Sequence, residues 1–261
     1  MKNVPVYLRS FIDQSLSSPR CLLCQLPSQQ RFPLCPGCEH DLPWLNSYCL
    51  QCAEPLPDSP SRSIIAPKSS AQFRCGHCLK QPPAFTHTYA PLRYEFPIDL
   101  LIQRIKHRAD YHSIELLSRL FCQRLQRSTH PLPLPLQLIP VPLHPKRLRQ
   151  RGFNQSLELA LSIGERLGIP VNNRLCSREL DTPHQQGLSA KQRRRNLRDA
   201  FRIHLDQIVG THVAIIDDVM TTGTTAHMLA KKLRQAGIVQ VDIWCLARTP
   251  AGRHPINSVP T

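Results

Sequence analysis

The stretch that decides the fold covers residues 212–234 and reads HVAIIDDVMTTGTTAHMLAKKLR. Its first part, residues 213–216, is a short β-branched apolar run, which predicts a strand buried on both faces of a parallel sheet. We expect this strand to end at two adjacent carboxylates, Asp217 and Asp218. A turn rich in hydroxyl groups follows, and apolar residues then recur at helical spacing. The predicted order is therefore strand, acidic pair, small-residue turn and helix.

The turn after the acidic pair, which we name the threonine loop, consists of Thr221, Thr222, Gly223, Thr224 and Thr225. The glycine can adopt backbone angles closed to other residues and lets a ligand approach the main chain. The N–H groups of the loop, with the positive end of the next helix behind them, make a site for a phosphate. Two carboxylates instead suit the vicinal hydroxyls of a sugar, or a divalent cation shared with it. A phosphate beside a diol describes a ribose 5-phosphate.

Other phosphate-binding motifs do not fit this stretch. A Walker A loop would carry a lysine after the glycine, and the G-x-G-x-x-G dinucleotide fingerprint is absent. An ordinary turn between strand and helix, with solvated acids, is the plain alternative. The residues resemble the phosphoribosyl-pyrophosphate (PRPP) motif of type I phosphoribosyltransferases. The resemblance implies that Asp217 and Asp218 bind the ribose hydroxyls, that residues 221–225 surround the 5-phosphate, and that Mg²⁺ accompanies PRPP.

The composition of the chain indicates an anionic partner. The 261 residues include 33 lysines and arginines against 18 acidic side chains, a formal net charge of +15. Such a charge favours nucleic acid or a phosphorylated substrate, although a generally basic protein is the plain alternative. No apolar run approaches the roughly 18 residues of a membrane span, and residues 1–20 lack the features of a signal peptide. We therefore expect a cytoplasmic protein.

Cysteines provide the second strong pattern. Eight of the eleven form four C-x-x-C pairs before residue 80. Without a signal peptide these thiols should stay reduced, and two such pairs complete a closed four-cysteine zinc site. A redox role like that of thioredoxin is the alternative for one pair, but four pairs in one loop-rich segment argue against it. We predict two structural Zn²⁺ ions, bound by Cys21, Cys24, Cys35, Cys38, Cys49, Cys52, Cys75 and Cys78.

The pairing of the cysteines has two possible forms. Sequential pairing assigns the first four cysteines to one ion and the last four to the other, whereas a cross-braced arrangement joins the first pair to the third. The ten-residue gap between Cys24 and Cys35 suits a compact zinc ribbon and favours sequential pairing. We expect the double zinc ribbon to cover residues 1–83, an α/β domain with a mainly parallel sheet to cover residues 84–250, and a tail to cover residues 251–261.

Two more segments of the α/β domain bear on the site. Residues 97–127 predict two amphipathic helices that pack on the sheet, with their basic residues, among them Lys106, in solvent. A dense basic run follows a predicted strand at residues 138–143 and leads into a helix over 154–167. Solvated charge is the usual interpretation of such a run. A loop at a strand end could instead hold pyrophosphate, and the candidates there are Arg147, Arg151, Asn154 and Gln155.

The basic run and its continuation, Arg-Gly-Phe-Asn-Gln-Ser at 151–156, resemble the ComF (GntX-like) family, and the likeness covers nearly the entire chain. That family is associated with DNA uptake in natural competence or with the use of external DNA. In type I phosphoribosyltransferases a hood covers the substrate, and the corresponding part of this chain lies near residue 190. The resemblance therefore implies that the hood or substrate contacts are Thr182, Gln185, Arg193 and Asn196.

Two functions follow from these observations. The first is a phosphoribosyltransferase that transfers the ribosyl group of PRPP to an unidentified acceptor, with Asp217 and Asp218 as the candidate catalytic residues. The second is a non-catalytic accessory of DNA import that binds single-stranded nucleic acid and retains the PRPP site as a sensor or a relic. Other DNA-import proteins are possible partners under either function. Aromatic residues make up only 6% of the chain, so stacking platforms for bases are not evident.

Overall fold

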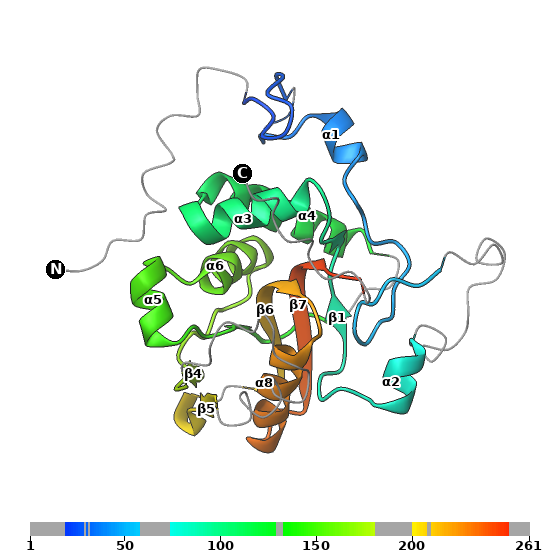
Figure 1. Cartoon of the computed structure of the whole chain (residues 1–261). Helices are drawn as coiled ribbons and strands as arrows, with labels where there is room; N and C mark the ends of the chain where they lie inside the picture. The colour runs from blue at the N-terminus through cyan, green and yellow to red at the C-terminus, as the bar shows by residue number, and fades with distance from the viewer. Residues whose placement is uncertain are drawn as a thin grey trace, which may run out of the picture. The chain divides into compact units, whose positions relative to one another are not determined.

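A computed structural model describes residues 19–28, 30, 32–57, 74–128, 133–180, 200–207 and 210–250 (Figure 1). The chain divides into two compact units, Met1–Leu42 and Pro43–Thr261. The first contains one cysteine cluster, and the second contains the other cluster together with the sheet. Within the described ranges, no helix has both the length and the apolar character needed to span a membrane.

The first unit is organised by its cysteines. A tight turn follows Cys21, where the Gln25 amide donates to the Cys21 carbonyl at 2.9 Å and Gln25 has a positive φ of 64°. The short helix α1 (Pro36–His40) then begins after Cys35, whose sulfur accepts a hydrogen bond from the Cys38 amide. Loop backbone, rather than a large apolar core, thus holds the four sulfurs together.

The second unit repeats this plan before the sheet begins. The sequences CLLCQLP at 21–27 and CLQCAEP at 49–55 align cysteine for cysteine. Ala53, in the place of Gln25, also has a positive φ of 54°, and its amide donates to the Cys49 carbonyl. The helix α2 (Gly76–Lys80) begins after Cys75 as α1 begins after Cys35. The two cysteine clusters are therefore structural repeats of one another.

Among the described residues the sheet of the second unit has five strands, and these strands pair with one another in parallel, which confirms the predicted α/β class. Its order is β1–β7–β6–β3, and β2 also pairs with β7. The strands are β1 (Thr88–Tyr89), β2 (Leu92–Arg93), β3 (Gln137–Pro140), β6 (His212–Met220) and β7 (Gln240–Arg248). A separate antiparallel hairpin joins β4 (Cys176–Arg178) to β5 (Phe201–Ile203).

One strand prediction needs correction, and one stretch of strand is interrupted. The strand expected to end at the acidic pair continues through Asp217 and Asp218 to Met220, because β7 still pairs with it at Asp217, Val219 and Met220. Residues 88–93 do not form one continuous strand but the two short strands β1 and β2. Pro91 lies between them, and a proline has no amide hydrogen to donate to the sheet.

Helices cover both faces of the sheet (Figure 1). On one face, α4 (Tyr111–Gln126) and α6 (Gln155–Leu167) pack together, and Phe121 of α4 contacts Trp244 of β7 with ring centroids 5.6 Å apart. On the other face, Leu229 and Leu233 of α8 (Thr224–Gln235) join the core formed by Ile215 and Ile243. The remaining helices are α3 (Ile98–Arg108), α5 (Pro145–Arg151) and the short 3₁₀ turn Leu205–Gln207.

Candidate functional site

The acidic pair lies near the carboxyl end of β6, at the edge of the sheet where the neighbouring parallel strands also end. Open α/β sheets bind their ligands at this edge. The Ser156 hydroxyl, at the start of α6, donates to Asp217 Oδ1 at 3.2 Å. The backbone amides of Asp218 and Val219 donate to Asp217 Oδ1 and Asp218 Oδ1 at 2.9 and 2.7 Å. Backbone and side-chain donors therefore fix both carboxylates.

Lys106 is the cation of this site, and its role was not predicted. Its Nζ lies 3.0 Å from Asp218 Oδ2, and the two side chains are 27% and 6% exposed. The prediction that the basic residues of this helix lie in solvent is therefore wrong for Lys106. Lys106 lies one turn after the buried Ile102 on α3, which places it at the edge of the apolar face. This spacing is the feature of the sequence that could have indicated a partly buried Lys106.

The two carboxylates differ in their surroundings. Burial, and then the negative charge of Asp218, raises the pKa of Asp217 to about 7. Burial would lower the pKa of Lys106, but the Asp218 carboxylate raises it, so Lys106 stays charged. The site thus contains one ion pair and one carboxylate that is half protonated near neutral pH. Strong perturbation of this kind is typical of functional positions.

Replacing Asp217 should make the free protein less sensitive to pH. The folded Asp217 keeps its proton up to a pKa of about 7, whereas the unfolded side chain releases it near the ordinary value of 3.8. The folded state therefore binds more protons between these values, and the stability of the wild type falls as pH rises through this window. As the pH rises from about 4 to 8, we expect the unfolding free energy of Asp217→Asn to increase by roughly 2–4 kcal/mol relative to that of the wild type.

Urea unfolding, followed by tryptophan fluorescence, measures this difference. Both tryptophans, Trp44 and Trp244, lie in the second unit, so their signal reports on the unit that contains the site. Asp206→Asn, at an exposed aspartate in a 3₁₀ turn, is the control and should follow the wild type. Parallel pH profiles for the wild type and Asp217→Asn would contradict the raised pKa.

The threonine loop connects β6 to α8 in a conformation that needs its glycine. Gly223 is the residue before α8 and has a φ of 71°, and a Cβ added there would lie 2.6 Å from Met220 Cε. The N-cap residue Gly223 has no side chain to cap the helix, and the Thr224 amide makes only a long hydrogen bond, 3.4 Å, to Thr222 Oγ1, so the start of α8 can still accept a ligand. The hydroxyls of Thr222 and Thr224 lie 2.8 Å apart and, with Thr221, on the accessible side of the loop. This geometry fits an anion at the start of α8.

The basic run forms the helix α5 rather than a loop. Pro145 occupies its first turn, the His144 side chain accepts from the Lys146 amide, and Gly152 ends it with a φ of 83°. These are start and stop signals of a helix. Arg151 Nη1 donates to Gln155 Oε1 at 2.5 Å. Arg147 also lies on this helix and is partly buried.

Asn154 joins the basic segment to the acidic pair. Its carboxamide oxygen caps α6 by accepting from the Ser156 amide at 3.0 Å, and its Nδ2 donates to the Val141 carbonyl at 3.1 Å. Ser156 in turn contacts Asp217. The structure therefore brings Ser156 to Asp217, with Asn154 fixing the start of α6, whereas Gln155 contacts Arg151. Outside the described residues lie the four predicted hood contacts, Thr182, Gln185, Arg193 and Asn196.

The cysteines gather into two clusters of four, Cys21/Cys24/Cys35/Cys38 and Cys49/Cys52/Cys75/Cys78. Sequential pairing is thereby confirmed. In each cluster the sulfurs lie within 4.8 Å of one another, and the Cys24–Cys35 and Cys52–Cys75 sulfurs are 3.7 and 3.6 Å apart. Four sulfurs at about 2.3 Å from a zinc ion would be about 3.8 Å apart, so both clusters fit a tetrahedral metal ion.

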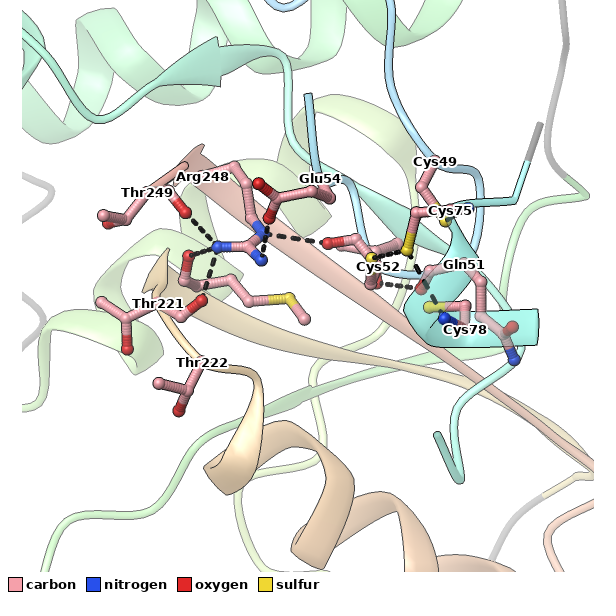
Figure 2. Close-up of polar contacts among 12 residues, drawn as sticks. Cys49, Gln51, Cys52, Glu54, Cys75, Cys78, Thr221, Thr222, Arg248 and Thr249 are labelled. Carbon is pink, nitrogen blue, oxygen red and sulfur yellow. Dashed lines mark hydrogen bonds and ion pairs between the residues drawn. The ribbon is translucent and has the colours of Figure 1, made fainter. Parts of the chain in front are cut away.

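The thiols of the second cluster differ in acidity: the hydrogen bond with Cys49 raises the pKa of Cys52, and burial raises the pKa of Cys78. A hydrogen bond from the Cys52 thiol lowers the pKa of Cys49 to about 4, so the cluster contains a thiolate at neutral pH. The Cys75 amide adds a hydrogen bond to the Cys49 sulfur at 3.2 Å. Figure 2 shows these cysteines beside an arginine, Arg248, that the sequence analysis did not identify. Arg248 ends an apolar strand, an unusual position for a cation and the signal that could have found it.

Comparison with known proteins finds several relatives along most of the chain, and two of them are representative. The chain is 34% identical over 233 residues to the "DNA utilization protein YhgH" of Salmonella typhi, a match that covers 88% of this chain and 96% of the relative. It is 36% identical over 219 residues to "Competence protein F" of Haemophilus influenzae, covering 82% and 90%. No family model matches the chain.

Shorter or looser similarities involve phosphoribosyltransferases. An amidophosphoribosyltransferase of Synechococcus elongatus is 31% identical over 107 residues, which is 39% of this chain and 20% of that protein. Among solved structures, a purine phosphoribosyltransferase from Pyrococcus horikoshii aligns with a TM-score of 0.31 at 16% identity, over 57% of this chain and 93% of that one. The two long matches, at more than 30% identity, show that the chain belongs to the family of competence protein F (ComF) and YhgH.

Proposed function

We propose that the second unit binds PRPP with Mg²⁺ and acts as a phosphoribosyltransferase in the uptake or use of external DNA. The observation that carries this proposal is the order along β6 and α8. Two fixed carboxylates lie at the end of a parallel strand, next to a glycine loop and a helix whose N-cap residue is that glycine. Carboxylates for a diol and amides for a phosphate are the two halves of a ribose 5-phosphate site.

The roles of the residues follow from their chemistry. Asp217 and Asp218 bind the ribose hydroxyls, and the threonine loop (221–225) binds the 5-phosphate. Asp217 and Asp218 are the carboxylates that would face Mg²⁺, which would supply positive charge to neutralise the pyrophosphate. Lys106 offsets the charge of the two adjacent carboxylates. The pyrophosphate side is assigned to Arg147, Arg151, Asn154 and Gln155, and the hood to Thr182, Gln185, Arg193 and Asn196.

The names of the relatives support the biological setting. Both long matches are proteins named for competence or DNA utilisation, and the shorter match is named for phosphoribosyl transfer. We infer that the chain acts in the cytoplasm, with zinc in both cysteine clusters, and that single-stranded DNA and other DNA-import proteins are its partners. The charge of +15 and the exposed Lys146 and Arg149 of α5 favour a nucleic-acid contact.

Calorimetric titration at two salt concentrations tests whether the site binds PRPP, as the transferase requires. A protein that binds DNA through 6–10 phosphate contacts loses about 10³–10⁵ in affinity between about 50 and 200 mM salt. PRPP binding that requires Mg²⁺ and weakens less than about tenfold over that range supports the sugar-phosphate site. Absence of PRPP binding at both concentrations, with tight and salt-sensitive DNA binding, would leave the accessory function and refute the transferase.

A further inference from the structure

Arg248 is a buried cation whose guanidinium is surrounded by acceptors. It is the last residue of β7 and is 6% exposed. A charge in such a place is destabilising unless it is paired and hydrogen-bonded. Its nitrogens contact backbone carbonyls on one side and a carbonyl and a carboxylate on the other (Figure 2). Arg248 therefore joins two parts of the unit that are far apart in sequence.

One side of Arg248 holds the chain where it leaves the sheet for the threonine loop. Nη1 donates to the Met220 carbonyl at 3.1 Å and to the Thr221 carbonyl at 2.5 Å, and it also contacts the Thr249 carbonyl. Met220 is the last residue of β6, and Thr221 is the first residue of the loop. The Met220 carbonyl also accepts from the Thr249 amide at 3.0 Å, so this backbone bond and the Arg248 contacts together fix the direction in which the loop begins.

The other side of Arg248 contacts the second cysteine cluster. Nε donates to the carbonyl of Cys52, itself a cluster cysteine, at 3.0 Å, and Nη2 lies 2.6 Å from Glu54 Oε2. Because the planar guanidinium presents donors in a fixed fork, it can hold both acceptors in one arrangement. The turn of the cysteine cluster and the start of the threonine loop are thus bound to the same side chain.

A second route connects the same two segments independently of Arg248. After α2, the Ala84 amide donates to His227 Nδ1 at 3.1 Å, and His227 lies in the first turns of α8. Phe85 lies 3.9 Å from the position that a Cβ would take on Gly223. Phe85, Met220 and Ala53 belong to one buried core. The segment that follows the cluster therefore packs beneath the threonine loop.

We propose that Arg248 is a positioning residue for the threonine loop, and that the second cysteine cluster, with its metal bound, holds Arg248 in place. The proposal rests on the function assigned to the loop above. The cluster then supports the ligand site rather than serving only as a separate folding module. The first repeat has Leu26 where the second has Glu54, so only the second repeat has a carboxylate at this position.

Hydrogen exchange and zinc content test the proposal on the full-length, zinc-loaded protein. Arg248→Lys keeps the charge but loses the fork, and Glu54→Gln removes one charged acceptor and is the milder change. We expect both variants to retain the wild-type zinc content. Amide exchange in residues 220–225 should accelerate about tenfold or more in Arg248→Lys and less in Glu54→Gln, while residues 213–216 stay protected. Arg202→Lys, at an exposed arginine, is the matched control and should exchange like the wild type.

The consequence for ligand is measured separately. With PRPP and Mg²⁺, we expect the dissociation constant to rise about tenfold or more in Arg248→Lys, since the loop must then be ordered on binding. Unchanged exchange in residues 220–225 in both variants would overturn the proposal, as would uniform loss of protection across the sheet. If the wild type does not bind PRPP, the proposed function fails, but the exchange data still decide whether Arg248 holds the loop.

Discussion

Asp217→Asn/Asp218→Asn is expected to lower the affinity for PRPP with Mg²⁺ by at least about 100-fold, because hydrogen bonds to charged groups contribute roughly 1.5–3 kcal/mol each. Both carboxylates are oriented in the free protein by the amides of Asp218 and Val219. The amide oxygens of asparagine could still accept hydrogen bonds from a diol, but they would carry no charge for the shared cation. With Mg²⁺ present, the double substitution should therefore lower the affinity for PRPP by more than the loss of two neutral hydrogen bonds would.

Titration calorimetry on the folded double variant provides the measurement. Asp206→Asn changes an exposed aspartate that accepts a hydrogen bond from the side chain of the neighbouring Gln207, and this variant should bind PRPP as the wild type does. Single-stranded DNA is titrated in parallel, and its affinity should stay unchanged or rise, because the substitutions remove negative charge. A double variant that binds PRPP within about threefold of the wild type would exclude the acidic pair as the sugar site.

The central features of the site could be predicted because they are local in sequence. Strand, acidic pair, loop and helix follow one another within residues 212–234, so periodicity and residue type were sufficient. The eight cysteines were equally predictable from their spacing, and the sequential pairing is confirmed. The end of β6 was predicted too early, since a polar pair suggests the end of a buried strand. Continued pairing with β7 overrides that local signal.

The residues that sequence reasoning missed act across large separations. Lys106 reaches Asp218 from α3, and Arg248 reaches Cys52 and Glu54 from the last strand. Charge patterning alone predicts that lysines and arginines lie in solvent. It contains no information on which helices and strands come together in the fold, so it does not identify a buried partner for such a residue. Both cations do lie beside buried apolar residues: Lys106 at the end of the apolar face of α3, and Arg248 at the end of the apolar strand β7. That context is the part of the pattern that indicates a tertiary role.

Loss of metal from the second cluster is expected to destabilise the unit that contains the sheet. Cys75→Ser removes one of four ligands, and its sulfur also accepts the Cys78 amide at the start of α2. Structural zinc sites contribute about 10–16 kcal/mol of binding free energy, so even partial loss should lower the unfolding free energy by at least about 3 kcal/mol. Unfolding is followed by tryptophan fluorescence, because Trp44 and Trp244 both lie in the second unit.

Cys35→Ser is the matched control, because the two clusters are structural repeats. Cys35 precedes α1 as Cys75 precedes α2, and its sulfur accepts the Cys38 amide in the same way. Each variant should lose about one zinc equivalent. Only Cys75→Ser should shift the unfolding transition that tryptophan fluorescence reports. The reason is that Thr88 Oγ1 of β1 donates to the Gln51 carbonyl at 2.7 Å, which connects the second cluster to the sheet. Equal shifts in both variants, or zinc loss in Cys75→Ser without a shift, would show that the second cluster does not support the sheet.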